Sequence, residues 1–409
     1  MPLSGREDMT WFGGWEGYAV SSIERIEGAV PEIWIYLSPL PLRSFQCDGC
    51  GMAVARLHEI EDRRVRDLSI LDARTWLYVP RRRVACPRCG PKLERLPWLG
   101  RYARVTTRFA ESVARLCRVL PVKHVAAFFH LSWTTVKEID KRHLAETLGP
   151  VDLSDVEVLA MDEFAIQKGH RYATVIIDPR IKRVLWVGRG RARQDVRPFF
   201  EQLGKDGCRR VRAVAMDMNA AYEQEVQAHC PQAAIVYDLF HVVANYGREV
   251  LDRVRVDEAN RLRDDKKARK VVKTARWLLL RNRDTIRRDE DRVKLDELLQ
   301  ANQTLMCVYV LKDDLKQLWR HTDQVAARAA WDSWLHRAED SGIQPLIAFA
   351  RKLKPYLEGI LAHCRWPLHT SLLEGINNKI KVIKRMAYGF RDDAYFFLKI
   401  RAAFPGNPR

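Results

Sequence analysis

Two aspartates occupy equivalent places in the sequence, each at the end of a short apolar run. Asp162 follows the run Val156–Met161, and Asp217 follows the run Val211–Met216. Runs of this length are typical of buried β-strands and are too short for a helix. Carboxylates at the ends of neighbouring strands repel each other and are costly to bury unless a cation lies between them. The two aspartates therefore predict a divalent-metal site.

A third carboxylate, Glu374, lies near the beginning of a predicted helix. The apolar positions of this helix recur three and four residues apart: Leu373, Ile376, Ile380, Ile383 and Ala387. Its flank carries amide and cationic side chains that suit a DNA backbone: Asn377, Asn378, Lys381, Lys384 and Arg385. In one interpretation Glu374 is a metal ligand. In the other, Ser371-x-x-Glu374 is a capping box, in which Glu374 only returns a hydrogen bond to the helix start.

The segments around the two aspartates predict strands and helices in the order β-β-β-α-β-α-β. After the strand that carries Asp162, they are Tyr172–Ile177, Arg183–Val187, helix Gln194–Leu203, Val211–Met216, helix Ala220–Ala228 and Ala233–Tyr237. We therefore predict an α/β fold with an RNase H-like mixed sheet. Such a fold places its third carboxylate on a late helix, which favours Glu374 as a metal ligand.

Asp238 and His241 stand three residues apart where the last predicted strand leads into a helix. In that position they would assist a metal site or bind a phosphate. They would equally well cap the helix and satisfy each other's hydrogen-bonding groups, which is the interpretation we favour for His241. Both are second-rank site candidates.

Four cysteines form two matched Cys-x-x-Cys pairs, each followed by glycine: Cys47, Cys50, Cys86 and Cys89. Two such pairs fill the four positions of a tetrahedral zinc site, so this Zn²⁺ would be structural. The segments Val65–Leu71 and Thr75–Val79 between the pairs predict a hairpin, which makes the region a zinc ribbon. Alternating residues in Ala19–Ile26 and Glu32–Leu37 predict two strands before it.

A helix, a short turn and a second helix are predicted after the zinc ribbon. Thr106–Leu120 and Val122–Phe129 have helical spacing, and Ser132 is an N-cap candidate for the helix Trp133–Leu144. This is the helix-turn-helix arrangement, although a generic helical hairpin has the same pattern. In the DNA-reading interpretation, bases and phosphates are contacted by Trp133, Thr134, Thr135, Lys137, Lys141 and Arg142.

From about residue 242 to 362 the sequence predicts long helices rich in Arg and Lys. They are expected at Asn245–Ala268, Val271–Arg281, Asp291–Val310, Lys312–His321 and Ala326–Asp340. Their charges are interpreted as solvated faces and most of their tryptophans as core: Trp277, Trp319, Trp331 and Trp334. A second hypothesis is that one of these tryptophans stacks on an unpaired DNA base.

The charge of the chain points to a polyanionic partner. Its 409 residues carry 70 Lys and Arg against 52 Asp and Glu, which gives a net charge of +18 spread over the whole length. Nucleic acid is the expected partner of such a field. There is no apolar run of about 18 residues and no signal-like N-terminus, so we expect no membrane partner and a cytoplasmic location at the bacterial nucleoid.

Five sequence blocks resemble the DDE transposases of the ISL-three family of insertion sequences. They are Met161–Phe164, Met216–Asn219, Asp238–His241, Glu374–Lys381 and Lys384–Arg391. The resemblance covers nearly the whole chain, because that family also carries a four-cysteine zinc finger and a helix-turn-helix before its catalytic domain. The block Glu-Gly-Ile-Asn-Asn-Lys is its most specific part.

The resemblance implies an enzyme that cleaves and joins DNA strands at the ends of an insertion sequence. Asp162, Asp217 and Glu374 match the catalytic triad, which would hold two Mg²⁺ (or Mn²⁺) ions for in-line attack at phosphorus. Candidates for phosphate contacts beside the triad are Lys379, Lys381, Lys384 and Arg385. The zinc ribbon and the helix-turn-helix would recognise terminal inverted repeats in double-stranded DNA. Pairing two ends implies a homo-oligomer on DNA.

Five segments are predicted along the chain. They are N-terminal strands and zinc ribbon (1–100), helix-turn-helix (101–150), first part of the catalytic core (151–245), all-helical insertion (246–362), and the C-terminal part of the core with the third carboxylate (363–409). Two other functions fit parts of this pattern. One is a non-catalytic DNA-binding regulator, and the other is an RNase H-like nuclease that acts on DNA structure without joining strands.

Overall fold

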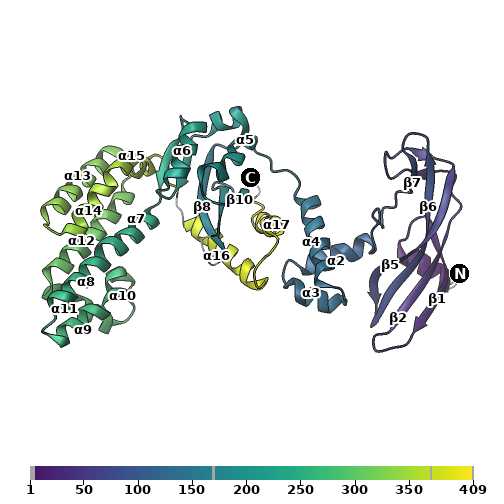
Figure 1. Cartoon of the computed structure of the whole chain (residues 1–409), viewed down its shortest axis with the longest axis horizontal. Helices are drawn as coiled ribbons and strands as arrows, with labels where there is room; N and C mark the ends of the chain where they lie inside the picture. Colours follow the sequence, from purple (N-terminus) through teal and green to yellow (C-terminus); the bar gives the residue numbers. More distant parts are fainter. Residues whose placement is uncertain (1–4, 168–170, 369–370, 408–409) are drawn as a thin grey trace. The chain divides into compact units, whose positions relative to one another are not determined.

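The computed structural model describes residues 5–167, 171–368 and 371–407, with side chains from Met9 onward except that of Ser371. The chain divides into two compact units, Met1–Gly149 and Pro150–Arg409. Figure 1 shows the helices and strands of each unit.

The first unit begins with a sheet in the order β1-β2-β6-β5, with β7 also paired to β6. Its strands are β1 Tyr18–Ile26, β2 Glu32–Pro39, β5 Leu57–Ile70, β6 Ala73–Cys86 and β7 Gly90–Leu93. Helix α1 Gly5–Gly13 precedes β1, and the short pair β3 Phe45–Gln46 and β4 Ala53–Val54 lies before β5. The predicted strands and hairpin are confirmed, but each hairpin strand is 14 residues long and extends well beyond the predicted segments.

Three helices complete the first unit: α2 Thr107–Leu116, α3 Val122–Phe129 and α4 Trp133–Leu148. The hydroxyl of Ser132 accepts a hydrogen bond from the backbone N–H of Thr135 at 3.1 Å, as predicted for an N-cap. Phe109, Val125 and Val136 share one small core, one residue from each helix. The three helices therefore share a core, against which Leu68 of β5 also packs.

The second unit contains a mixed sheet in the order β10-β9-β8-β11-β12. Its strands are β8 Val158–Gln167, β9 Arg171–Asp178, β10 Arg183–Arg189, β11 Ala213–Met216 and β12 Ala234–Tyr237. The first three are antiparallel, whereas β11 pairs in parallel with both β8 and β12. Helix α5 Arg193–Arg210 precedes β11, and α6 Ala220–His229 follows it. This is the predicted RNase H-like order.

Two predicted bounds in this region are wrong. Strand β8 does not end at Asp162 but continues to Gln167, because β9 pairs with it along this length. Helix α5 does not end at Leu203: it continues to Arg210 across a break at Gly204, whose φ of 72° suits glycine.

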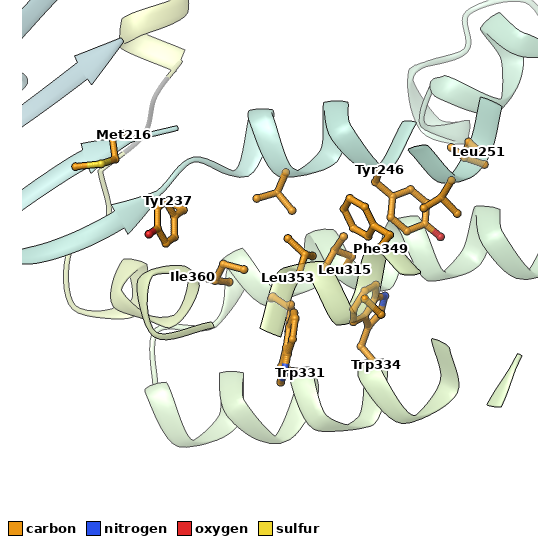
Figure 2. Packing of buried hydrophobic residues seen from close by; sticks show 14 of the residues in the cluster. Met216, Tyr237, Tyr246, Leu251, Leu315, Trp331, Trp334, Phe349, Leu353 and Ile360 are labelled. Atoms are coloured by element: carbon orange, nitrogen blue, oxygen red, sulfur yellow. The ribbon is translucent and has the colours of Figure 1, made fainter. Parts of the chain in front are cut away.

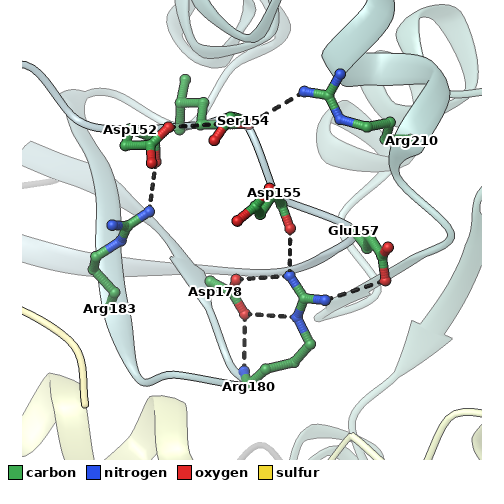
Figure 3. Close-up of polar contacts among 9 residues, drawn as sticks. Asp152, Ser154, Asp155, Glu157, Asp178, Arg180, Arg183 and Arg210 are labelled. Carbon is green, nitrogen blue, oxygen red and sulfur yellow. Dashed lines mark hydrogen bonds and ion pairs between the residues drawn. The ribbon is translucent and has the colours of Figure 1, made fainter. Parts of the chain in front are cut away.

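A polar cluster fastens the segment before β8 to the sheet. The guanidinium of Arg180 donates to Asp178 at 3.1 Å, to Glu157 at 3.1 Å and to the backbone carbonyl of Asp155 at 2.7 Å. Arg183 contacts the carbonyl of Asp152 in the same cluster (Figure 3). The first strand of the sheet therefore starts from an anchored position.

After β12 the chain forms a helical region, which separates the sheet from its last helices in the sequence. Its helices are α7 Leu239–Tyr246, α8 Asp252–Arg261, α9 Lys266–Thr274, α10 Arg276–Leu280, α11 Asp289–Ala301, α12 Gln303–Gln317, α13 Gln324–Asp340, α14 Gln344–Leu353 and α15 Leu357–Leu361. A π-helical turn, Gly247–Leu251, joins α7 to α8.

Four of the five long helices predicted here are wrong. Val271–Arg281 is divided between α9, which ends at Thr274, and α10, which begins at Arg276, and no helix begins at Lys312, because α12 runs unbroken from Gln303 to Gln317. A capping residue divides each of the other two. Asn245–Ala268 is divided where Asp265 accepts hydrogen bonds from the backbone of Lys267 and Ala268 and starts α9. Asp291–Val310 is divided where Asn302 accepts from the backbone of Leu305 and starts α12. Side-chain caps of this kind begin a new helix even where the apolar spacing continues.

One hydrophobic core runs from the sheet into this helical region. Met216 and Tyr237 of the sheet belong to the same cluster as Tyr246, Trp334 and Phe349 (Figure 2). The rings of Tyr246 and Phe349 meet edge to face with centroids 5.2 Å apart. The helical region is therefore built onto the sheet and shares its core.

The last helices, α16 Ser371–Met386 and α17 Asp393–Ala403, cover one face of the sheet. Leu373, Ile376 and Ile380 of α16 are buried against residues such as Ala160 and Phe164 of β8. The other face is covered by α5 and α6. In the part of the chain that the structure describes, we find no helix long and apolar enough to cross a membrane.

Candidate active site

Asp162 lies where β8 parts from its parallel neighbour β11. The last pair in register is Ala160 with Ala215, and Asp217 follows the final residue of β11. Extending the register by two residues therefore brings Asp162 and Asp217 to the same edge of the sheet. Asp162 is 7% exposed and alternates with Ala160 and Phe164, so it faces α16.

Both oxygens of the Asp162 carboxylate have donors. The backbone N–H of Glu163 donates to Oδ1 at 2.7 Å, and the side-chain amide of Asn377 donates to Oδ2 at 2.6 Å. Burial raises the pKa of Asp162 to about 6, and the nearby charge of Asp217 also raises it. The carboxylates of Asp162 and Asp217 repel each other, and a bound cation would relieve this repulsion.

Asp217 is held by a histidine from the next helix. Nδ1 of His241 lies 3.2 Å from Oδ2 of Asp217, and its Nε2 lies 3.7 Å from Asp238. Although burial favours the neutral ring, the carboxylates of Asp217, Asp162 and Asp238 raise the pKa of His241 to about 9. Burial also opposes ionisation of Asp217, but the hydrogen bond and charge of His241 outweigh it and lower the pKa of Asp217.

Asp238 and His241 therefore have different surroundings. Asp238 caps α7 by accepting a hydrogen bond from the backbone N–H of Phe240 at 2.8 Å. His241 lies closer to Asp217 than to Asp238, a contact that the sequence did not indicate. The i, i+3 spacing predicted the contact of His241 with Asp238, but only the fold brings β11 beside α7.

Helix α16 connects Asp162 to the third predicted ligand. Asn377 is half-buried, and Glu374 lies one turn earlier on the same helix with its side chain exposed. Within the described residues, the Oδ1 atom of Asn377 is buried without a hydrogen-bond partner. The Ser371 side chain lies outside the described residues, and with it the capping-box interpretation of Glu374.

The donor set fits a hard divalent cation, although the three carboxylates are not gathered around one point. Over the described residues, the four cysteines are the group of three or more ligands whose atoms all lie within 4.8 Å of one another. Asp162 and Asp217 still meet the chemical requirement, because each offers carboxylate oxygen at one polar edge of the sheet. The buried Oδ1 of Asn377, which has no hydrogen-bond partner among the described residues, is a further oxygen on the side chain that contacts Asp162.

Three basic residues of α16 already contact the protein. Nζ of Lys384 donates to the carbonyl of Ala165 at 2.8 Å, and Nζ of Lys379 donates to that of Ala403 at 2.9 Å. Lys381 lies 3.4 Å from Oδ1 of Asn378. Lys381, Arg385 and Asn378 are exposed and thus accessible to a DNA backbone.

The four predicted zinc ligands come together in the first unit. Cys47 and Cys86 are buried, and the sulfurs of Cys50 and Cys86 lie 3.7 Å apart. Gly51, after the first pair, has a φ of 74°, a turn that glycine adopts without strain. The four thiols fit a tetrahedral zinc ion.

The six side chains of α4 that were predicted to contact DNA differ in exposure. Trp133, Thr134, Thr135 and Arg142 are exposed, while Lys137 and Lys141 are half-buried. The ring of Trp133 is 58% exposed and thus accessible to a partner.

The four tryptophans of the helical region differ in burial. Trp331 and Trp334 are each 1% exposed and Trp319 is partly buried, so the core interpretation is confirmed for most of them. Trp277 is 68% exposed. Of the four, it is the one that remains accessible to a partner.

Comparison with known proteins gives matches to three family models. Residues 43–89 match a zinc finger of the transposases IS204, IS1001, IS1096 and IS1165, and residues 94–144 match a helix-turn-helix domain of transposase family ISL3. Residues 159–400 match the DDE transposase model of the same family. The third match covers more than half of the chain.

Two relatives are named as transposases of insertion sequence elements. The chain is 57% identical over 405 residues, 99% of each chain, to the transposase for insertion sequence element IS1001 of Bordetella parapertussis. It is 27% identical over 331 residues, 76% of this chain and 74% of the relative, to the transposase for insertion sequence element IS1557 of Mycobacterium tuberculosis.

Proposed function

This chain belongs to transposase family ISL3 and is a DDE-type transposase, and from this premise we propose how its residues move an insertion sequence. The substrate is double-stranded DNA that carries the terminal inverted repeats of the element. The reaction is metal-dependent strand cleavage followed by transfer of the freed strand to target DNA, and the metal ligands are Asp162, Asp217 and Glu374.

The hydrogen bond from Asn377 to Asp162 is the observation that supports this assignment most strongly. It joins the first strand of the sheet to the helix that carries Glu374, two segments more than 200 residues apart in sequence. It therefore holds the helix that carries Glu374 against the strand that carries Asp162.

Each residue of the site has a role in positioning. Asp162 and Asp217 hold two oxygens at one edge of the sheet, His241 orients Asp217, and Asn377 orients Asp162. Two bound Mg²⁺ (or Mn²⁺) ions would activate the attacking hydroxyl and stabilise the leaving oxygen. Lys381 and Arg385 extend from the exposed side of α16 toward the phosphates of the cleaved strand.

The first unit supplies end recognition. Zinc held by the four cysteines fixes the two Cys-x-x-Cys pairs against the long hairpin. Helix α4 presents its exposed face to the terminal repeat. Both ends of the element must be brought together for transposition, so the active form is a homo-oligomer on DNA.

The test is a strand-transfer assay with Mg²⁺, a duplex carrying the terminal repeat and a supercoiled target plasmid. A transposase cuts at the repeat and produces joined plasmid, and a scrambled repeat abolishes both products. Binding without any cut would support a DNA-binding regulator instead. Cutting that follows DNA shape, ignores the repeat and gives no joined product would support a nuclease.

A further inference from the structure

The helical region carries a strongly basic helix that the proposed chemistry does not use. Helix α9 has the sequence KKARKVVKT, with five basic residues and no acidic one. Lys266, Lys270 and Lys273 are spaced i, i+4 and i+7, so they lie along one side of the helix, and all three are exposed. The opposite side is buried through Val272.

These three lysines differ from other cations of the same region. Throughout the described residues, no hydrogen bond or ion pair engages the ammonium groups of Lys266, Lys270 and Lys273. By contrast, Arg328 pairs with Glu358 at 2.6 Å, Arg337 with Asp314 at 2.7 Å and Lys354 with Glu339 at 2.8 Å. The ammonium groups of these three lysines are therefore left outside the ion pairs of the described residues.

Trp277 lies on α10, just beyond the end of the lysine row. Its ring is 68% exposed, and the guanidinium of Arg276 lies 5.6 Å from the ring centroid. An exposed ring of this size offers a surface on which a sugar or a base can stack. A nucleic acid offers phosphates to the lysines and sugar or base surfaces to the ring, so it fits both features.

Two buried basic side chains fix this surface from beneath. Nη1 of Arg255 donates to the carbonyl of Lys273 at 2.7 Å, at the end of α9. Nζ of Lys312, 1% exposed, donates at 3.0 Å to the carbonyls of Leu279 and Arg281, at the end of α10. Helices of 9 and 5 residues are too short to be stable alone. Both are held in place while their outward side chains remain accessible.

We infer that Lys266, Lys270 and Lys273 form a duplex-DNA backbone-binding surface, separate from the helix-turn-helix and from the basic face of α16. The inference rests on the proposed function, because the surface gives the transposase a further binding contact with the same DNA. Contacts to phosphates carry no base sequence, so the surface holds repeat and non-repeat DNA alike.

The test measures binding of full-length protein to labelled duplexes as a function of salt concentration. The variant is Lys266→Gln/Lys270→Gln/Lys273→Gln. The matched control is Arg328→Gln/Arg337→Gln/Lys354→Gln, which removes the same charge from ion-paired positions. Each phosphate contact contributes about 0.9 to the slope of log K against log salt, so the α9 variant loses about 2–3 from the slope. Its affinity in 0.1 M salt falls on the order of 10- to 100-fold.

Two duplexes separate the inference from the function on which it rests. The α9 variant is expected to weaken binding to repeat and scrambled duplexes equally, while the control keeps the parent slope. The single change Lys270→Gln should lower the slope by about 1 and guards against misfolding of the triple variant. An α9 variant with the parent slope, or a control that loses as much as the α9 variant, would overturn the inference. A parent protein that neither prefers nor cuts the repeat would instead defeat the proposed function.

Discussion

Asn377 and His241 each tie one of the predicted metal-binding aspartates to another element. The sequence indicated Asp162, Asp217 and Glu374 because carboxylates follow apolar runs or stand at a helix start. It did not indicate that Asn377 bonds to Asp162 or that His241 bonds to Asp217. Both contacts join residues distant in sequence, and spacing along one helix or strand carries no information about such pairs.

At this scale we predict that Asn377→Ala impairs catalysis without impairing DNA binding. Without its amide, the buried Asp162 carboxylate loses one of its two donors and its fixed orientation. A misplacement of about 1 Å costs on the order of 100-fold in rate. Single-turnover cleavage should fall by that order while affinity for the repeat is unchanged.

Asn378→Ala is the matched control, because it removes the same amide from the next, exposed position of α16. Its effect should be confined to affinity. If Asn377→Ala cleaved at the parent rate, Asn377 would not position Asp162.

Among the elements, those with local signals were predicted best. Helix α3 was predicted to the residue and α4 at its first residue, because Ser132 marks the start of α4. In the helical region the same kind of signal, Asp265 and Asn302, was missed inside stretches with continuous helical spacing. A cap within a periodic pattern takes effect only where tertiary packing also turns the chain, which local pattern does not reveal.

The buried ammonium group of Lys312, which donates to carbonyls at the end of α10, makes the stability of the protein depend on pH. Burial lowers the pKa of Lys312 to about 7, whereas an unfolded lysine titrates near about 10.4. Between these values the unfolded chain binds more protons than the folded one, so stability rises with pH. The contribution of Lys312 to stability rises by about 2 kcal/mol from pH 7 to 9, whereas the raised pKa of His241 acts in the opposite direction over the same interval. In urea unfolding at the two pH values, the change in stability from pH 7 to 9 should therefore be more positive in the parent than in Lys312→Met by about this amount. An equal pH response in both proteins would contradict the prediction.

The zinc ribbon should depend on its metal. We predict about one bound zinc per chain by atomic absorption. Cys86→Ser should abolish binding of that zinc and weaken end recognition, because the zinc site loses one of its four ligands. Cys307→Ser, which changes a partly buried cysteine outside the cluster, is the control and should keep the zinc. Full zinc content in Cys86→Ser would refute the four-cysteine site.

For the molecule as a whole, charge and composition pointed correctly to a DNA-acting protein. They did not indicate that the helical region shares one core with the catalytic sheet, from Met216 to Trp334. Nor does net charge distinguish the cations that are ion-paired, such as Arg337, from the exposed lysines of α9. That distinction depends on which surfaces face each other after folding.

The central claim is that Glu374 completes a metal-binding triad with Asp162 and Asp217, and Glu374→Gln tests it most directly. Glutamine still caps a helix in a capping box but lacks the carboxylate charge. The measurement is Mg²⁺-dependent cleavage and joining of repeat DNA, with the exposed Glu297→Gln of α11 as control. We predict that Glu374→Gln binds the repeat like the parent and neither cuts nor joins it. Cleavage at the parent rate would show that Glu374 is only a helix cap and would contradict the account.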